Sequence, residues 1–227
     1  MLIRYAFCVD EVEQDARFQQ LEQVVSKKRY EKMQKYRFPI DKIRSLFAEL
    51  LVRYVLKKHF QIEGADIEFD YNEYGKPFLK GQKNLFFNVS HSGSWVICAV
   101  SDKPVGVDVE EIKDRNLDIA ERFYSKKETE AIKESDMGNE LFYHYWTLKE
   151  SYVKAEGKGM SISFSSFAFS IEGEDILLEV EGKSCLTYQF QVYKIDDGTL
   201  AATCSCEKPE GIFDEVSINQ IEEMLLR

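Results

Sequence analysis

The chain has 227 residues, enough for one large domain or two small ones, and its 44% hydrophobic and 31% charged content is ordinary for a soluble globular protein. A net charge of -10 argues against nucleic acid as a general partner. The first residues lack the features of a secretion signal, no apolar run approaches a membrane span, and five cysteines are an odd count, so we expect reduced thiols in a cytoplasmic protein.

The charge is unevenly distributed along the chain. Between Ser26 and Lys58, eleven Lys and Arg residues stand against three acids, a local charge of +8 that leaves -18 for the remainder. Such a segment suits an anionic ligand, most simply phosphate groups, although a solvated basic helix face has the same composition.

The first half of the chain is predicted to build helices and short strands around one long apolar helix. The expected strands are 2–9, 66–71, 84–90 and 94–101, and the expected helices are 13–25, 27–37 and 42–60. Ser26 is placed to cap the second helix, Pro39 to break it and Asp41 to cap the third. Ser45 would then lie in the first turn of the third helix, where free backbone N–H groups favour an anion.

Two polar positions fall in predicted turns. Lys76 lies between Gly75 and Pro77, where a solvated lysine is expected. His91 is placed at the tip of the hairpin between strands 84–90 and 94–101, and a histidine at a hairpin tip is usually exposed to solvent. Its neighbour Ser90 adds a second polar side chain there.

The second half is predicted to repeat the order of elements in the first. The expected strands are 104–110, 165–172, 175–180, 187–195, 199–205 and 213–218, and the expected helices are 117–123, 126–135, 140–156 and 219–226. Strand 104–110 is expected to pair with 94–101. We predict an α+β fold of two similar halves, 1–103 and 104–227, each with a long helix packed on a mainly antiparallel sheet and with a site in the cleft between them.

The strand at 104–110 alternates strictly in character. The valines at 105, 107 and 109 face one side, while Gly106, Asp108 and Glu110 face the other. Gly106 either leaves open space or lets a ligand or another backbone come close. Two carboxylates on one face repel each other unless a cation lies between them or one is protonated. The simpler explanation is the exposed polar face of an edge strand.

The helix at 140–156 carries charges among apolar residues and ends at Gly157. Glu150 and Lys154 lie four residues apart on its apolar stripe, which is costly in a buried helix unless they are paired or bind a charged group. A structural ion pair is the simpler reading. With Asp108 and Glu110, however, Glu150 completes an oxygen site of three carboxylates, which magnesium prefers, usually with phosphate in the remaining positions.

Together these segments resemble the surfactin-synthetase type of 4'-phosphopantetheinyl transferase over nearly the whole chain. The motifs that carry the resemblance are Tyr74–Pro77, Asn88–Ser92, Val105–Glu110, Phe123–Glu128 and Trp146–Lys154. The resemblance implies two α+β halves with coenzyme A in the cleft between them. It also implies transfer of the phosphopantetheine arm of coenzyme A to a serine of an apo peptidyl or acyl carrier protein, with release of adenosine 3',5'-bisphosphate.

The resemblance assigns roles to individual residues. Asp108, Glu110 and Glu150 would hold magnesium on the pyrophosphate, and Lys154 would contact the pyrophosphate and stabilise or protonate the leaving phosphate. The other predicted coenzyme A contacts are Arg29, Lys32, Ser45, Lys76, Ser90 and His91. The base for the carrier serine would be Glu150 or a metal-bound water. Glu128 is a third possibility, because its spacing from Ser125 also fits a helix capping box.

The carrier protein would bind near residues 158–169, and a monomer is expected because one chain supplies both halves of the cleft. Arg29 stands where the family has a lysine, and the chain is shorter than expected near 136–138, in a predicted loop. One alternative is a magnesium-dependent hydrolase of a nucleotide diphosphate such as coenzyme A. A non-catalytic protein that binds coenzyme A or a carrier is the other, and the presence of Asp108, Glu150 and Lys154 disfavours it.

Overall fold

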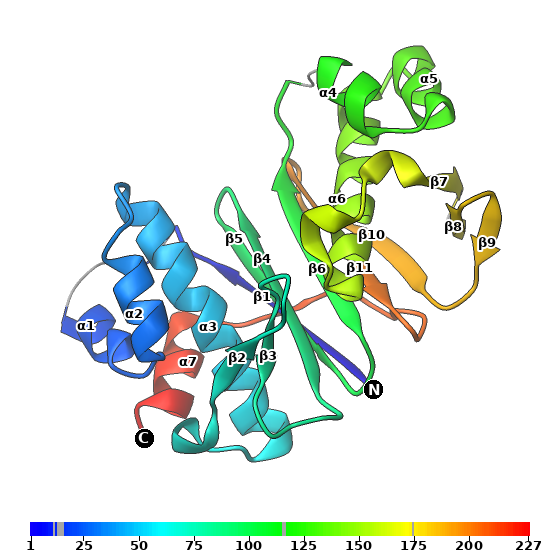
Figure 1. Ribbon diagram of the computed structural model, residues 1–227. Coiled ribbons are helices and arrows are strands. Elements are labelled where there is room, and N and C mark those ends of the chain that lie inside the picture. Colours follow the sequence, from blue (N-terminus) through cyan, green and yellow to red (C-terminus); the bar gives the residue numbers. More distant parts are fainter. Residues whose placement is uncertain (11, 13–15, 115–116, 174) are drawn as a thin grey trace.

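The computed structural model describes residues 1–10, 12, 16–114, 117–173 and 175–227 (Figure 1). The helices are α1 (Ala16–Glu22), α2 (Lys27–Met33), α3 (Pro39–Phe60), α4 (Leu117–Phe123), α5 (Lys126–Glu134), α6 (Gly138–Glu156) and α7 (Ile218–Leu225). The strands are β1 (Leu2–Cys8), β2 (Phe69–Tyr71), β3 (Pro77–Leu79), β4 (Phe86–Ser92), β5 (Trp95–Ser101), β6 (Val105–Glu111), β7 (Phe167–Glu172), β8 (Asp175–Val180), β9 (Lys183–Cys185), β10 (Gln189–Asp196), β11 (Thr199–Ser205) and β12 (Asp214–Glu215). The predicted α+β class is confirmed.

The N-terminal part packs the long helix α3 on a sheet with the strand order β12-β1-β5-β4. Apolar residues of α3 are fully buried against this sheet, and the rings of Phe7 and Phe47 stack at 4.0 Å. The helix begins at Pro39, earlier than predicted, because proline lacks the N–H that a first helical position leaves unbonded and has a suitable φ. Asp41 therefore lies inside the first turn, and Ser45 lies beyond it.

The C-terminal part packs α6 on a sheet with the order β10-β11-β6 (Figure 1). Helix α6 ends at Gly157, whose φ of +71° is the left-handed conformation expected of a C-terminal glycine. The prediction that β6 pairs with β5 is wrong. Both edges of β5 are occupied, by β1 and β4, so β6 pairs with β11 instead, with Asp108 opposite Ala202.

The two parts meet where β4 and β6 lie side by side. The valines at 105, 107 and 109 are completely buried and form a shared core with Ile97 and Ala99 of β5. No backbone ladder between β4 and β6 is found within the described ranges; a side chain bridges them instead, because the amide oxygen of Asn88 accepts a hydrogen bond from the backbone N–H of Val107 at 2.8 Å. The polar edge of β6 is thereby held open beside β4.

Several predicted boundaries differ from the structure. Strand β4 continues to Ser92, so His91 lies within a strand and not at a hairpin tip. The segment around Lys76 is the turn of a hairpin whose second strand, β3, was not predicted. Residues 13–15 of the predicted first helix lie outside the described residues. None of the helices in the described ranges combines the length and hydrophobicity needed to span a membrane.

Candidate active site

The carboxylate of Asp108 is buried at the seam between β4 and β6. Its Oδ1 atom accepts hydrogen bonds from Ser90 Oγ at 2.8 Å and from Lys154 Nζ at 2.6 Å, while its Oδ2 atom is buried and has no hydrogen-bond partner in the described part of the chain. Burial raises the pKa of Asp108, and the Lys154 ammonium opposes that shift. One oxygen of this carboxylate thus remains available to a further cation.

Glu110 lies two residues along the same face and is less enclosed. Its Oε2 atom accepts a hydrogen bond from Ser92 Oγ at 2.9 Å. Burial and the nearby carboxylates of Asp108 and Glu150 raise the pKa of Glu110 to about 7. The repulsion that the sequence predicted between carboxylates on this strand face is therefore present, and a cation among them would relieve it.

Helix α6 supplies Glu150 and Lys154 from the opposite side of the site. Burial, first, and then the charge of Asp108 raise the pKa of Glu150, while Lys154 lowers it. The close approach of this helix to β6 depends on Gly106, because a Cβ atom there would lie 1.9 Å from the backbone oxygen of Ser151. Of the two readings of Gly106, the close approach of another backbone is the correct one.

Ser90 and His91 come from consecutive positions of β4 and so face opposite sides of the strand. Ser90 is buried and also accepts a hydrogen bond from Lys154 Nζ at 2.9 Å. The pKa of His91 is lowered to about 4, first by desolvation and then by the positive charges of Lys154 and Arg44. His91 is nevertheless exposed in the free protein, where it lines the polar cavity, and its lowered pKa makes the imidazole mainly neutral at pH 7.

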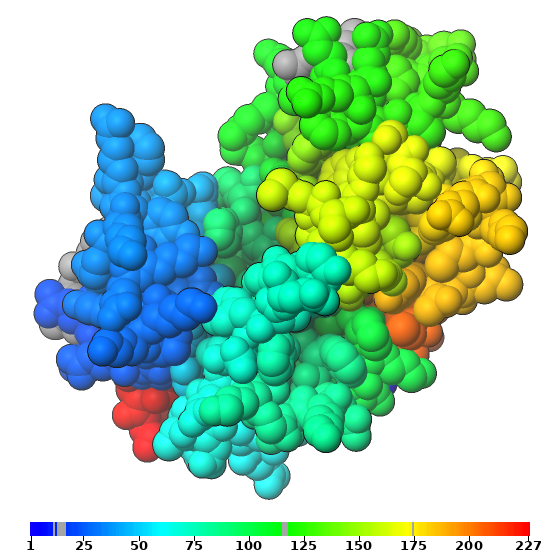
Figure 2. Space-filling model, in the orientation of Figure 1, coloured from blue at the N-terminus to red at the C-terminus, as the bar shows by residue number. Residues whose placement is uncertain are grey.

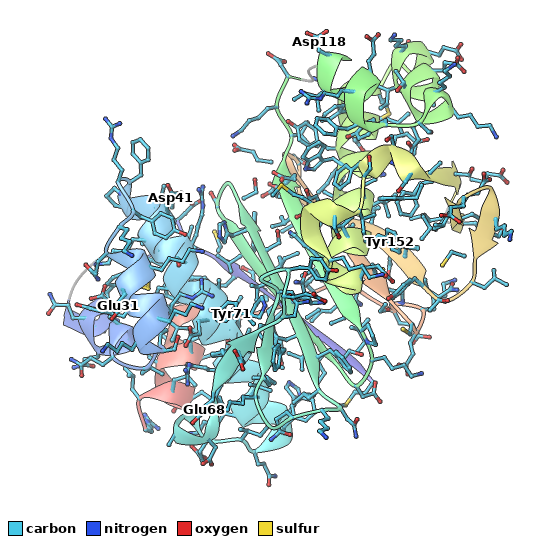
Figure 3. All side chains as sticks on the ribbon, in the orientation of Figure 1. Glu31, Asp41, Glu68, Tyr71, Asp118 and Tyr152 are labelled. Atoms are coloured by element: carbon cyan, nitrogen blue, oxygen red, sulfur yellow. The ribbon has the colours of Figure 1, made fainter. Side chains whose placement is uncertain are left out.

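The basic segment contributes α2 and the start of α3. The guanidinium of Arg29 bonds to Ser45 Oγ at 3.2 Å and to Glu49 Oε2 at 3.4 Å. Ser45 is itself buried, so it would act on a ligand indirectly, by holding the guanidinium of Arg29. Lys32 is exposed, and Lys28 lies with its ammonium 3.3 Å from the ring centre of Tyr71, which Figure 3 labels on β2.

One cavity of 840 Å³, here called the polar cavity, brings most of these residues together. It is lined by Lys28, Arg29, Glu31, Lys32, Lys35, Ala48, Tyr71, Gly75, Pro77, Val89, Ser90, His91, Asp108, Glu110, Glu150 and Lys154. Figure 2 shows a hollow between the blue N-terminal helices and the green and yellow C-terminal part. The mainly basic residues of α2 thus line the same cavity as the carboxylates of β6 and α6.

A second cavity of 590 Å³, here called the apolar pocket, shares Gly75, Pro77, Glu150 and Lys154 with the polar cavity. Its lining is Tyr74, Gly75, Lys76, Pro77, Asn88, Phe123, Trp146, Glu150, Val153, Lys154, Gly157, Gly159, Met160, Ile162, Ser163 and Phe164. Trp146 packs edge-on against Phe164 with ring centres 5.6 Å apart, and Met160 is fully exposed at the rim. The two cavities meet at the charged residues of α6.

Lys76 lies in the predicted turn, but its ammonium is not solvated as the sequence suggested. Its stem is half-buried, and its ammonium donates hydrogen bonds to the backbone oxygens of Lys154 at 2.5 Å, Ala155 at 3.1 Å and Val105 at 3.3 Å. Burial lowers the pKa of Lys76 to about 8. The contact of Lys76 with a nucleotide stays a prediction.

Glu128 lies in a structural network. Its carboxylate bonds to the backbone N–H of Ser125 at 2.7 Å and of Phe169 at 2.8 Å, and forms a completely buried ion pair with Lys149 at 3.1 Å. The predicted capping box is thus present. With both oxygens engaged inside the core, Glu128 is poorly placed to accept a proton from a substrate.

The sequence reasoning missed Asn88 and Ser92 as partners of β6, and Lys149 as the partner of Glu128. A signal for the first two exists, because Asn88, Ser90 and Ser92 alternate along β4 with the same period as the acidic face of β6. Ser90 and Ser92 each bond to the carboxylate eighteen residues further along the chain.

The donor set fits magnesium. Asp108 offers a buried oxygen that has no hydrogen-bond partner among the described residues, and Glu110 and Glu150 add carboxylates whose pKa values are raised by burial first and then by neighbouring carboxylates. Among the residues the structure describes, no set of three Asp, Glu, His or Cys side chains converges on one point as a complete metal site. Magnesium commonly binds one or two carboxylates together with substrate phosphates, so a set of carboxylates that does not form a complete site by itself agrees with magnesium binding.

Comparison with known proteins identifies the family to which this chain is similar. A family model described as the 4'-phosphopantetheinyl transferase superfamily matches residues 104–204, and one described as 4'-phosphopantetheinyl transferase, N-terminal, matches residues 13–103. A Thermotoga maritima holo-[acyl-carrier-protein] synthase structure overlaps 48% of this chain and 65% of its own, at 24% identity and a TM-score of 0.40.

Curated relatives match over most of their length. The Bacillus subtilis 4'-phosphopantetheinyl transferase ffp is 41% identical over 193 residues, covering 83% of this chain and 86% of its own. The B. subtilis 4'-phosphopantetheinyl transferase Sfp is 35% identical, covering 88% and 90%, and a Bacillus pumilus 4'-phosphopantetheinyl transferase is 36% identical, covering 92% and 90%. The chain therefore belongs to the 4'-phosphopantetheinyl transferase superfamily.

Proposed function

We propose that this protein is a holo-[carrier protein] synthase that transfers the 4'-phosphopantetheine group of coenzyme A to a serine of an apo carrier protein and releases adenosine 3',5'-bisphosphate. The observation that carries the proposal is the polar cavity. It joins the basic side of α2 to the carboxylates of β6 and to Glu150 and Lys154 of α6. A nucleotide with phosphates at two places matches this division of charge.

Coenzyme A would lie across the polar cavity between the two groups of charges. Arg29 and Lys32 would attract its 3'-phosphate, with Ser45 holding the guanidinium of Arg29 in place. The pyrophosphate would lie at the other side, near Ser90 and Lys154. His91, as a neutral imidazole, can donate a hydrogen bond to a phosphate oxygen without adding charge.

Asp108, Glu110 and Glu150 would hold Mg²⁺ against the pyrophosphate. When bound, magnesium supplies positive charge that offsets the charge developing on the transferred phosphoryl group and on the leaving phosphate. Lys154 now bonds to Asp108 Oδ1 and so neutralises the carboxylate in the free protein. The same ammonium is placed to bond to the pyrophosphate once substrate arrives.

The transfer needs a base and a group that stabilises the leaving phosphate. The carrier serine Oγ forms a new bond to the phosphorus that bears the pantetheine arm, and the bond from that phosphorus to the bridging oxygen breaks. We assign acceptance of the serine proton to Glu150, because this carboxylate lines both the polar cavity and the apolar pocket, and burial raises its pKa. Lys154 donates a hydrogen bond to the leaving phosphate.

The apolar pocket would receive the pantetheine arm and contacts from the carrier protein. It shares Glu150 and Lys154 with the polar cavity, and its far side is formed by residues 159–164, within the predicted carrier surface 158–169. Carrier proteins are commonly acidic, and this chain has a net charge of -10. Apolar contacts from Met160 and Phe164 would let the two associate despite repulsion between like charges.

We further propose that residues 1–103 and 104–227 act as two halves of a single monomeric unit in the cytoplasm. Support for the halves comes from separate hydrophobic cores around α3 and around α6, with the exception that β12 and α7, at the end of the second half, pack with the core around α3. Support for a reducing compartment comes from the five cysteines, which are all unpaired. Sedimentation of the purified protein would give its mass in solution, and a stoichiometric dimer would contradict the monomer.

The test is intact-mass spectrometry of an apo peptidyl carrier protein after incubation with this protein, coenzyme A and Mg²⁺. A mass gain of one phosphopantetheine, lost with EDTA and with Glu150→Gln, is expected. Glu140→Gln is a matched control, because Glu140 lies on the same helix and pairs with Lys194 away from the site. Cleavage of coenzyme A without any gain on peptidyl or acyl carriers would favour the hydrolase instead.

A further inference from the structure

The turn of the β2–β3 hairpin crosses from the N-terminal part to the C-terminal end of α6. Figure 2 shows the turquoise hairpin atoms against the yellow segment that follows α6. Two side chains of the turn make the contact. Lys76 donates to the backbone oxygens of Val105, Lys154 and Ala155, and Asn72 Nδ2 donates to the backbone oxygen of Gly157 at 2.7 Å.

These bonds use the full donor capacity of the lysine. An ammonium has three N–H bonds, and Lys76 has three backbone acceptors on two elements, the last turn of α6 and the start of β6. The last carbonyls of a helix have no partner within the helix and carry partial negative charge. A lysine from another part of the chain thus caps α6 at the turn that contains Lys154.

The turn is itself built to present these two side chains. Asn72 Oδ1 accepts the backbone N–H groups of Tyr74 at 3.0 Å and Lys76 at 2.8 Å, so one amide side chain both shapes the turn and bonds to α6. Gly157 makes room for the contact, because a Cβ atom there would lie 2.8 Å from Cδ of Lys76.

The hairpin also forms a wall of both cavities. Tyr71, Gly75 and Pro77 line the polar cavity, and Tyr74, Gly75, Lys76 and Pro77 line the apolar pocket. The elements that Lys76 joins carry the site's charges, since Lys154 follows Glu150 on α6 and Val105 precedes Asp108 on β6. The distance between wall and charges therefore depends on the contacts of Asn72 and Lys76.

We propose that Lys76 is a positioning residue which, together with Asn72, fastens the β2–β3 hairpin to the ends of α6 and β6 and so sets the nucleotide-binding wall against the carboxylates and Lys154. This inference rests on the proposed transferase function. It differs from a direct contact between Lys76 and the nucleotide, which would affect the binding of coenzyme A. A positioning role affects the chemical step, because a shift of about 1 Å in the reacting groups costs on the order of a hundredfold in rate.

The experiment compares Lys76→Met, Asn72→Asp and Lys80→Met with the wild type in steady-state transfer to an apo carrier protein. Lys76→Met keeps the stem and removes the donors. Asn72→Asp keeps the acceptor that shapes the turn and replaces the donor to Gly157 by an oxygen. Lys80→Met is the control, because Lys80 belongs to the same hairpin but is exposed and pairs only with Glu68 among the described residues.

We expect Lys76→Met to lower kcat about 10- to 100-fold and Asn72→Asp to lower it less, both with the KM for coenzyme A within about threefold of the wild type. Lys80→Met should behave as the wild type. A raised KM with unchanged kcat in Lys76→Met would overturn the proposal and assign Lys76 to the nucleotide. Unchanged kinetic constants in Lys76→Met would overturn it as well.

Amide hydrogen exchange separates this proposal from the transferase function. Lys76→Met should speed exchange both in the 72–76 turn and in the last turn of α6, whatever reaction the protein catalyses. If the wild type transfers nothing to any carrier, the proposed function fails, and the exchange data alone decide the positioning role. Unchanged exchange in both segments would then overturn it. If Lys76→Met does not fold, Asn72→Asp provides the same comparison.

Discussion

Gly106→Ala is the sharpest test of how the site is assembled. A Cβ atom at this position would lie 1.9 Å from the backbone oxygen of Ser151 and 2.5 Å from the backbone nitrogen of Ala155. Real Cβ contacts essentially never fall below 3.0 Å, so α6 and β6 must separate by at least about 1.1 Å. Both obstacles are backbone atoms, which cannot rotate away as a side chain could.

Two consequences follow from that separation. Overpacking of a core typically costs about 1–3 kcal/mol of stability, and we expect the upper end because a whole helix must move. The same movement carries Glu150 and Lys154 away from Asp108, so the transfer rate should fall on the order of a hundredfold. Urea unfolding followed by the fluorescence of the two tryptophans measures the first effect, and the initial rate of carrier modification measures the second.

Gly198→Ala is the matched control. Gly198 lies at a turn before β11, lacks a positive φ, and would place its Cβ no nearer than 3.7 Å to Asp196 Oδ1. It should change neither stability nor rate. Wild-type behaviour of Gly106→Ala, within about 0.5 kcal/mol and twofold in rate, would refute the conclusion that backbone contact positions the site.

Three further predictions follow from the same contacts. The pKa of Glu110 is raised from 4.5 to about 7, so folding of the metal-free protein takes up a proton at this group. The contribution of Glu110 to the free energy of unfolding should therefore be greatest below about pH 4.5 and be lost as the pH rises through 7. Thermal unfolding in EDTA at several pH values should show a smaller loss in Glu110→Gln than in the wild type, because the raised pKa values of Asp108 and Glu150 still contribute in the variant, and parallel slopes would contradict it. Glu128→Gln leaves the buried Lys149 without its ion-pair partner and should lower the free energy of unfolding in urea by about 3–5 kcal/mol. The kcat per folded molecule should not change. A collapse of kcat in fully folded protein would instead make Glu128 the base. Gly157→Ala and Gly159→Ala both place alanine at positive φ, but only the Cβ at position 157 would meet a lysine stem, at 2.8 Å. Gly157→Ala should therefore lower the urea midpoint more than Gly159→Ala. Equal midpoints would show that backbone strain alone matters.

Local sequence patterns predicted the elements of the site well. The alternation around Asp108 and Glu110 indicated a strand with one buried apolar side, and the three valines there are completely buried. The apolar run that ends at Gly157 indicated α6, and the spacing from Ser125 to Glu128 indicated a capping box, which is present. Each of these features depends on neighbours within a few residues, which the sequence displays directly.

Strand pairing and side-chain direction were decided by the tertiary structure. Nothing near β6 in the sequence shows that both edges of β5 are occupied. The pairing of β6 with β11, whose paired residues lie 88 to 100 positions apart, could therefore not be predicted from alternation. Lys76 looked like a solvated turn residue because its three acceptors lie on segments 29 to 79 residues distant. Sequence by itself determined which residue types and local periods were available for a phosphate and metal site. Only the folded chain decided which of them meet, because hydrogen bonds and close backbone contacts between distant segments depend on how the two halves pack.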